Sequence, residues 1–274
     1  MSIISINENT CNKCGICVQS CPVAIIGLEN ESKLPIVKSE KESYCIYCGH
    51  CESVCPEGAL THQLAQMAMA PGNVGISEIN PVDLGNYFRF RRSVRNYKTD
   101  NVDRKILEQA LEIVRYSPTG HNSQLNKWIV VYETKLVEQL ASASVDWMAK
   151  ILNLQPDLAK RYGYDRLVIA YKRGKDHICR KAPHLLVCYT PADYPIGAKD
   201  ATIATSHLEL LLPSYGIGSC WAGYLMTALN QSNEVKALIG LNETHAIHGV
   251  LLIGYPKYKY YKTPFRNKPD VKWL

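Results

Sequence analysis

Eight of the eleven cysteines lie in two short blocks with the same spacing, and this pattern constrains the fold more than any other feature of the 274 residues. Each block reads C-x2-C-x2-C-x3-C-P, with Pro22 after the first and Pro56 after the second. Three thiolates spaced in this way can wrap one iron-sulfur cubane, while the fourth, carried beyond the loop, points elsewhere. The spacing therefore predicts iron-sulfur clusters. The cysteines are Cys11, Cys14, Cys17 and Cys21 in the first block and Cys45, Cys48, Cys51 and Cys55 in the second.

The two blocks also form an internal repeat at an offset of 34 residues, in which Gly15 recurs as Gly49. Such a repeat predicts a module with approximate twofold symmetry. Structural zinc and paired disulfides are the alternatives. Zinc sites usually pair two C-x2-C units and need neither the third cysteine nor the trailing proline. Disulfide frameworks are typical of small secreted chains, and this chain is neither small nor marked by a secretory signal.

Residues 1–65 resemble a bacterial two-cluster 4Fe-4S ferredoxin over their whole length. In that family the fourth cysteine of each block ligates the other cluster. The resemblance therefore implies that one cluster is held by Cys11, Cys14, Cys17 and Cys55, and the other by Cys45, Cys48, Cys51 and Cys21. The connection between the halves, residues 28–41, is longer than in the family and is expected to form an extended hairpin or a surface loop.

The rest of the chain has a different organisation. Residues 66–82 are rich in Met, Gly, Ala and Pro and are interpreted as a linker, which leaves a second domain over residues 83–274. Alternating helical and strand patterns there predict an α+β fold with a central sheet flanked by helices. Helical spacing recurs around residues 102–116, 136–152, 157–171, 198–212 and 232–238, and strand patterns fall at 128–132, 185–189 and 248–253.

Four segments of the second domain suggest a site. They are RRSVRNY (91–97), SPTGHNSQ (117–124), GIGSCWAGYL (216–225) and GYPKYKYYKTPFR (254–266). In this order and at these separations they resemble the FMN-dependent nitroreductase family over about residues 83–274. The glycines of the third segment have the spacing G-x-G-x4-G, without the strand, helix and acidic follower of a dinucleotide-binding site, which excludes a Rossmann motif.

The resemblance implies specific contacts to FMN. Guanidinium groups of the first segment suit the phosphate and the flavin edge where negative charge develops on reduction. The loop of the second segment, where Thr119 and Gly120 replace the family's serines, reaches FMN across a subunit interface, which implies a homodimer. His121 in this loop is a candidate proton donor. The implied FMN contacts are Arg91, Arg92, Ser93, Arg95, Pro118, Thr119, Gly120, Asn122, Trp221, Ala222, Gly223, Lys262 and Arg266.

Together the two resemblances predict an oxidoreductase. An external low-potential donor, a ferredoxin or a flavodoxin, reduces the clusters, the clusters reduce FMN, and FMN reduces a small electron-poor organic acceptor such as a nitroaromatic or a quinone. The segment around residues 146–176 is expected to cover the substrate pocket. Two alternatives to this prediction remain open. The first is a module that relays electrons to a protein partner. The second is an NAD(P)H-dependent FMN reductase whose clusters are the electron exit.

Charge and hydropathy exclude other classes. Residues 1–65 carry a net charge of −3 and the remainder carries +9. Two oxidised clusters would add about −2 each and so lower the total charge further. The pI of about 8.7 is therefore weak support for nucleic-acid binding. No apolar run approaches the roughly 18 to 20 residues that a membrane span needs. The protein is expected in the cytoplasm of an anaerobic host, where exposed clusters are protected from oxygen.

Overall fold

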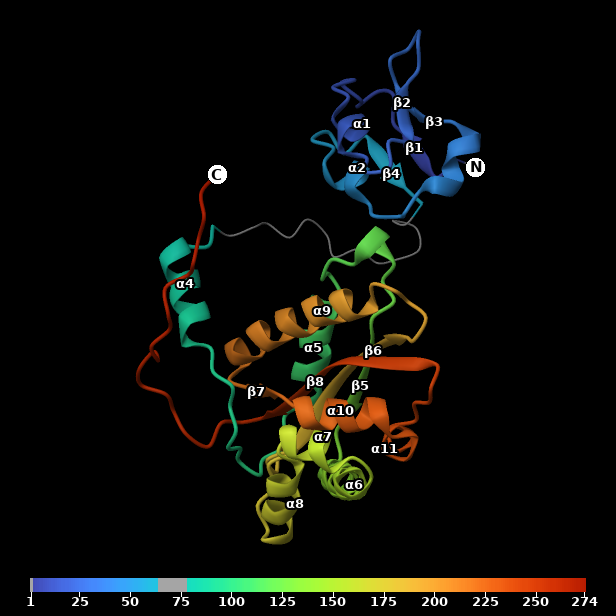
Figure 1. Cartoon of the computed structure of the whole chain (residues 1–274). Helices are drawn as coiled ribbons and strands as arrows, with labels where there is room; N and C mark the ends of the chain where they lie inside the picture. Colours follow the sequence, from blue (N-terminus) through green and yellow to red (C-terminus); the bar gives the residue numbers. More distant parts are fainter. Residues whose placement is uncertain (1, 64–77) are drawn as a thin grey trace. The chain divides into compact units, whose positions relative to one another are not determined.

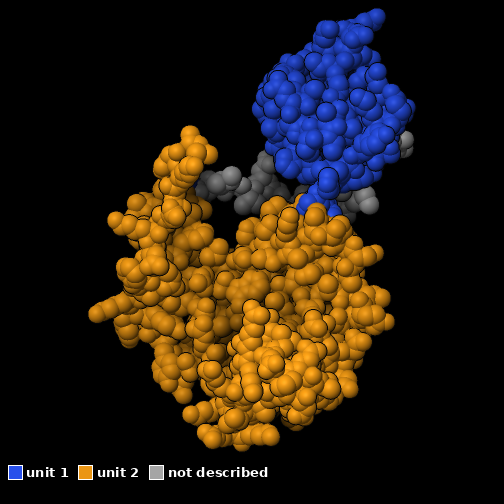
Figure 2. Space-filling view, in the orientation of Figure 1, with its two compact units in different colours: residues 1–78, 120–123 blue, residues 79–119, 124–274 orange. Residues whose placement is uncertain are grey.

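The computed structural model describes residues 2–63 and 78–274. The chain divides into two compact units, Met1–Glu78 with Gly120–Ser123, and Ile79–Thr119 with Gln124–Leu274 (Figure 2). Of the predicted linker, residues 66–82, the part from 66 to 77 lies outside the described residues. The last two residues of the linker, Pro81 and Val82, begin helix α4 (Pro81–Phe90), which Asn80 caps by accepting a hydrogen bond from the N–H of Val82 at 2.8 Å.

The sequence repeat of the first unit is folded into a structural repeat (Figure 1). Helix α1 (Ile16–Ser20) precedes strand β2 (Ile26–Leu28), and helix α2 (His50–Ser53) precedes strand β4 (Leu60–His62), both at the 34-residue offset of the cysteine blocks. Gly15 and Gly49 stand immediately before the helices, each with φ of 72°. Glycine adopts this left-handed conformation without the steric cost of a Cβ atom, so the chain can turn sharply into each helix.

Two small antiparallel sheets complete this unit. Strand β1 (Ile4–Ile6) pairs with β4, and β2 pairs with β3 (Pro35–Val37). The β2–β3 pairing is the hairpin expected for the longer connection. The interior is small and combines aliphatic side chains with the cysteine blocks: Ile3, Ile4, Cys17, Ile25, Ile26, Cys51 and Leu60.

The second unit is built on one four-stranded sheet of order β5-β6-β8-β7, in which all neighbours are antiparallel. Its strands are β5 (Lys127–Val131), β6 (His184–Pro191), β7 (Gly218–Trp221) and β8 (His245–Gly254). Successive side chains of the central strands point to opposite faces. Leu186 and Leu251 pack on one face, whereas Leu185 and Leu252 pack on the other.

Helices cover both faces of this sheet, which confirms the predicted α+β class (Figure 1). One face is covered by α5 (Arg104–Val114) and α9 (Gly197–Leu211), and the other by α6 (Thr134–Leu154) and α10 (Gly223–Gln231). The remaining helices are α7 (Pro156–Arg161), α8 (Tyr164–Lys172) and α11 (Asn233–Ala237). In the part of the chain that is described, no helix combines the length and apolarity required to cross a membrane.

Helix α9 lies very close to strand β8 because small residues meet at the contact. A Cβ atom at Gly249 would stand 2.9 Å from both Cβ and Cγ2 of Thr205, and closer still to its hydroxyl oxygen. Thr205 is fully buried, and its hydroxyl donates to the carbonyl of Ala201 at 2.7 Å. The close packing of helix on sheet therefore depends on the absence of a side chain at position 249.

Candidate functional site

The two cysteine blocks line two separate small cavities in the first unit. Each cavity receives three cysteines from one block and the fourth from the other, which is the grouping that the ferredoxin resemblance implies. The first is lined by Cys11, Cys14, Cys17 and Cys55, and the second by Cys45, Cys48, Cys51 and Cys21.

The spacing of these sulfurs bears on the zinc alternative. Among the described residues, no three metal-ligating side chains are grouped tightly enough to hold a single metal ion. A tetrahedral zinc site with bonds of about 2.3 Å draws its sulfurs much closer together than a cubane does. Burial also raises the pKa of the Cys51 thiol to about 11, so a bound metal must displace its proton.

One histidine contacts the second cavity. His62 at the end of β4 is buried, and its Nε2 lies 3.6 Å from Sγ of Cys45. Its backbone N–H donates to the carboxylate of Glu52 at 3.2 Å, and its ring meets the ring of Tyr47 edge-on at 5.6 Å. Burial lowers the pKa of the imidazole. No sequence motif pointed to a role for His62.

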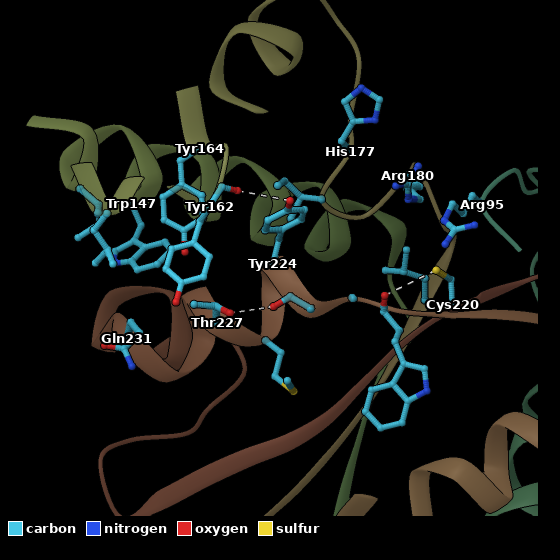
Figure 3. Close-up of a pocket in the computed structure, with 18 of the residues that line it drawn as sticks. Arg95, Trp147, Tyr162, Tyr164, His177, Arg180, Cys220, Tyr224, Thr227 and Gln231 are labelled. Atoms are coloured by element: carbon cyan, nitrogen blue, oxygen red, sulfur yellow. Dashed lines mark hydrogen bonds between the residues drawn. The ribbon is translucent and has the colours of Figure 1, made fainter. Parts of the chain in front are cut away.

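The second unit contains a cavity of about 690 Å³. Four of the predicted FMN contacts line it, namely Arg95, Trp221, Ala222 and Gly223. Figure 3 shows Arg95 and Arg180 toward one end, beside Cys220, and aromatic side chains toward the other. None of the described residues that line the cavity is acidic, so its charge is positive.

The segment that carries Arg95 is fixed against strand β7. Ser93 forms a parallel bridge with Ser219, and the N–H of Val94 donates to the carbonyl of Ser219 at 2.8 Å. A Cβ atom at Gly218 would lie 2.7 Å from Val94 Cγ2, so this approach also needs a glycine. The first and third sequence motifs are therefore joined along one edge of the sheet.

A carboxylate from α9 links the same two motifs. Glu209 accepts from Nη1 of Arg91 at 2.9 Å through one oxygen and from the indole N–H of Trp221 at 3.1 Å through the other. The Glu209 side chain is only 12% exposed and that of Arg91 28%. Glu209 thus holds the orientation of two predicted FMN contacts, although it belongs to none of the four sequence motifs.

We expect Glu209→Ala to destabilise the second unit by about 1–3 kcal/mol, because it leaves the indole N–H and the guanidinium without their acceptor. Glu209→Gln keeps one carbonyl acceptor and should lose less. Urea unfolding measures both. Glu234→Ala removes the exposed ion pair of Glu234 with Lys150 and is the matched control, expected to leave stability unchanged. Equal effects of the alanine variants would contradict the linking role of Glu209.

Arg180 reaches the cavity from a turn that precedes β6. The carboxylate of Asp176 accepts from the backbone N–H groups of Ile178, Cys179 and Lys181 at 2.8 to 2.9 Å. Arg180 and Lys181 have φ of 55° and 52°, a left-handed backbone that this carboxylate stabilises. Burial raises the pKa of the Cys220 thiol, and the nearby charges of Arg95 and Arg180 act against that shift.

The opposite end of the cavity is aromatic. Tyr164 contacts Trp147, Tyr162 and Tyr224, with ring centroids 5.6, 5.9 and 6.4 Å apart. Burial, with smaller contributions from the two neighbouring tyrosines, raises the pKa of Tyr164. Three of these residues belong to the segment 146–176 that was expected to cover the pocket. That segment consists mainly of the end of α6 together with α7 and α8.

The backbone N–H groups of Ala222 and Gly223 differ in their surroundings. Ala222 follows the last residue of β7, and its N–H donates to the carbonyl of Val250 at 2.8 Å. Gly223 is the first residue of α10, where N–H groups have no acceptor within the helix. The N–H of Ala222 is therefore engaged with β8, whereas that of Gly223 has no acceptor within its helix.

The other predicted FMN contacts do not line the cavity, and their roles stay predictions. Pro118 and Thr119 belong to the second unit, whereas Gly120, His121 and Asn122 group with the first. Arg92 donates to the carbonyls of Arg89 and Arg91. Lys262 and Arg266 are exposed in the tail.

Comparison with known proteins matches both units. Residues 88–255 match the nitroreductase family, and residues 3–75 match the 4Fe-4S dicluster domain. A ferredoxin of Methanocaldococcus jannaschii is 34% identical over 59 residues, which cover 21% of this chain and 89% of that protein.

The second unit has its own relatives. An NADH dehydrogenase of Thermus thermophilus is 26% identical over 176 residues, which cover 61% of this chain and 83% of that protein. An FMN-bound nitroreductase of Bacteroides fragilis superposes with a TM-score of 0.57 at 23% identity, over 72% of this chain and all of that one. The predicted fusion is therefore confirmed: the chain belongs to the nitroreductase family and carries a ferredoxin-type 4Fe-4S dicluster domain in addition.

Proposed function

We propose that this protein is an iron-sulfur flavoprotein reductase. Two 4Fe-4S clusters pass single electrons from an external ferredoxin or flavodoxin to FMN, which reduces a small electron-poor organic molecule such as a nitroaromatic or a quinone. The observation that carries the proposal is the cavity of about 690 Å³, cationic at one end and aromatic at the other, beside Trp221, Ala222 and Gly223. Its volume falls in the range of about 300–1,000 Å³ for cofactor and ligand sites.

The two cysteine-lined cavities support an assignment of the cluster ligands. Cys11, Cys14, Cys17 and Cys55 would hold one cluster, and Cys45, Cys48, Cys51 and Cys21 the other. The ferredoxin relative supports this assignment. Reduced thiols are maintained in the cytoplasm, where we place the protein.

The residues of the cavity fit FMN. Arg95, with Arg180 beside it, would stabilise negative charge at the flavin edge, because guanidinium groups form strong charge-assisted hydrogen bonds. The N–H of Gly223 would meet the ring at the start of α10. When bound, FMN accepts electrons singly and releases them in pairs, which links cluster chemistry to two-electron reduction. The aromatic wall around Tyr164 would stack against a flat acceptor.

We further propose that the functional unit is a homodimer. Helix α4 carries four apolar side chains that are each between 42% and 67% exposed: Val82, Leu84, Phe88 and Phe90. Large exposed apolar patches mark interaction surfaces. In the tail Phe265 and Trp273 are exposed at 85% and 92%. The loop of Pro118, Thr119, Gly120 and Asn122 would then contact the FMN of a second copy, and Lys262 and Arg266 would close on its phosphate.

Two alternatives compete with this function. A relay module would bind FMN in the same cavity but would need no aromatic wall beside the flavin for a flat small-molecule acceptor. NAD(P)H as the donor is favoured by one observation, the similarity to the NADH dehydrogenase of Thermus thermophilus. In that case the clusters would carry electrons away from FMN.

The test is stopped-flow reduction of the flavin in anaerobically purified protein, by reduced ferredoxin and separately by NADPH. Fast reduction by ferredoxin alone supports the proposed direction of electron flow. Fast reduction by NADPH reverses it, and protein that contains clusters but binds no FMN contradicts the proposal. Saturable turnover of a nitroaromatic or a quinone separates an enzyme from a relay module.

We expect Arg95→Ala to weaken FMN binding about 10- to 100-fold, since a hydrogen bond to a charged group contributes about 1.5–3 kcal/mol. Fluorescence titration of flavin-free protein with FMN measures this change. Lys98→Ala removes an exposed cation three residues away and is the control. If both variants bind FMN as the unaltered protein does, Arg95 is not a flavin contact.

A further inference from the structure

The two halves of the first unit differ at one position next to a cysteine sulfur. At the 34-residue offset, β4 corresponds to β2, so His62 corresponds to Leu28. Leu28 is 42% exposed and has no polar group, whereas His62 is 1% exposed and has its Nε2 3.6 Å from Sγ of Cys45. The internal repeat is therefore chemically asymmetric.

Backbone donors do not remove this asymmetry. The N–H of Tyr47 donates to Sγ of Cys45 at 3.4 Å, and the N–H of Ala59 donates to Sγ of Cys55 at 3.3 Å. These two sulfurs belong to different cysteine sets, so both sets receive backbone donors. Within residues 2–63, His62 is the one side chain that hydrogen bonds a sulfur of either set.

The position of His62 is held from two sides. Its backbone is tied to the carboxylate of Glu52, which α2 carries, and its ring packs edge-on against Tyr47. A thiolate bound to iron has no proton and can only accept, so Nε2 at this distance must be the donor. A donor to a ligand sulfur stabilises the reduced cluster, which carries one more negative charge than the oxidised one.

We propose that His62 gives the cluster of Cys21, Cys45, Cys48 and Cys51 a higher reduction potential than the cluster of Cys11, Cys14, Cys17 and Cys55. The inference rests on the proposed function, since it requires both clusters. A single electron that enters the protein therefore resides on the cluster beside His62. The two clusters therefore differ in reduction potential and are reduced one after the other.

The experiment is a potentiometric titration of the anaerobic holoprotein, followed by electron paramagnetic resonance after iron and sulfide have been quantified. The unaltered protein should show two distinct midpoints. His62→Leu should lower the higher one by about 59 mV, which is a tenfold change in a one-electron equilibrium, and leave the other in place. His62→Gln retains an N–H donor and should recover most of the shift.

His50→Leu is the matched control. His50 is exposed in the same block, and its Nδ1 lies 3.3 Å from the carbonyl of Cys48 without a contact to sulfur. This variant should keep both midpoints. A midpoint lowered equally by the leucine and glutamine variants of His62 would assign the effect to packing and overturn the inference.

A measurement on unaltered protein decides the matter even if the leucine variant fails to assemble its clusters. With ¹⁵N-labelled histidine, hyperfine spectroscopy of the half-reduced protein should detect a histidine nitrogen at the cluster reduced first. Coincident midpoints, or no such coupling, overturn this inference while the proposed function stands. Protein without clusters would overturn both.

Discussion

Protein carrying Cys51→Ala is expected to lose one entire cluster, about four of eight irons, together with ferredoxin-driven reduction of its flavin. Cys51 is 9% exposed and lies in the interior of the first unit beside Cys17 and Leu60. Its loss removes one of the four cysteine ligands of the second cavity, and the other three cysteines there are already used. Because cluster binding contributes folding free energy, the first unit should also become sensitive to proteolysis.

The flavin itself provides the internal comparison for this variant. FMN content and reduction by dithionite should persist, because the second unit has its own core. Cys188→Ala removes a cysteine that is also buried but lies in β6, and it should retain all eight irons. Ferredoxin-driven reduction at the original rate in Cys51→Ala would contradict the proposed route through this cluster.

The largest expected effect on the second unit comes from Gly249→Ala. The added Cβ would stand 2.9 Å from Cβ and Cγ2 of Thr205 and nearer to its hydroxyl, inside the contact between β8 and α9. Overpacking of this kind costs about 1–3 kcal/mol, and more where neither side can move. Gly249 and Thr205 are both buried, so we expect about 3 kcal/mol, equivalent to roughly 6–12 °C in Tm for a domain of this size.

Two further variants sharpen this prediction. Gly85→Ala lies in α4, where an added Cβ meets nothing within 4 Å, and should leave Tm unchanged or raise it. Thr205→Ala in combination with Gly249→Ala should recover part of the loss, because the hydroxyl and the methyl group are removed. Simple additivity of the two substitutions would show that the clash is not the cause.

The cysteine sets were the most predictable part of the site. Spacing alone indicated iron-sulfur chemistry, and the ferredoxin resemblance gave the exchange of fourth cysteines that the two cavities display. The apolar run of β6, from His184 to Cys188, is fully buried and was readily identified as a strand. Helix α5 was expected too, and the side chain of Asp103 caps it.

Other elements lacked a local signal. Strand β7 has only four residues, and only Ala222 separates it from the start of α10 at Gly223. The sequence around Trp221 therefore has the pattern of a turn rather than that of a strand followed by a helix. Helix α4 has no buried side chain, and no helix was predicted there. Glu209 and Arg180 reach the site from distant segments, and only tertiary packing brings a lone glutamate of α9 to Trp221.

The exposed apolar side chains of α4 have a consequence for how activity depends on the amount of protein. If association of two copies completes the FMN site, cofactor binding and subunit association are linked, and each strengthens the other. Dilution then releases cofactor, and added cofactor restores association. Specific activity would fall at protein concentrations below the dissociation constant of the dimer. The abundance of the protein in the cell would therefore set the active fraction as well as the quantity of enzyme.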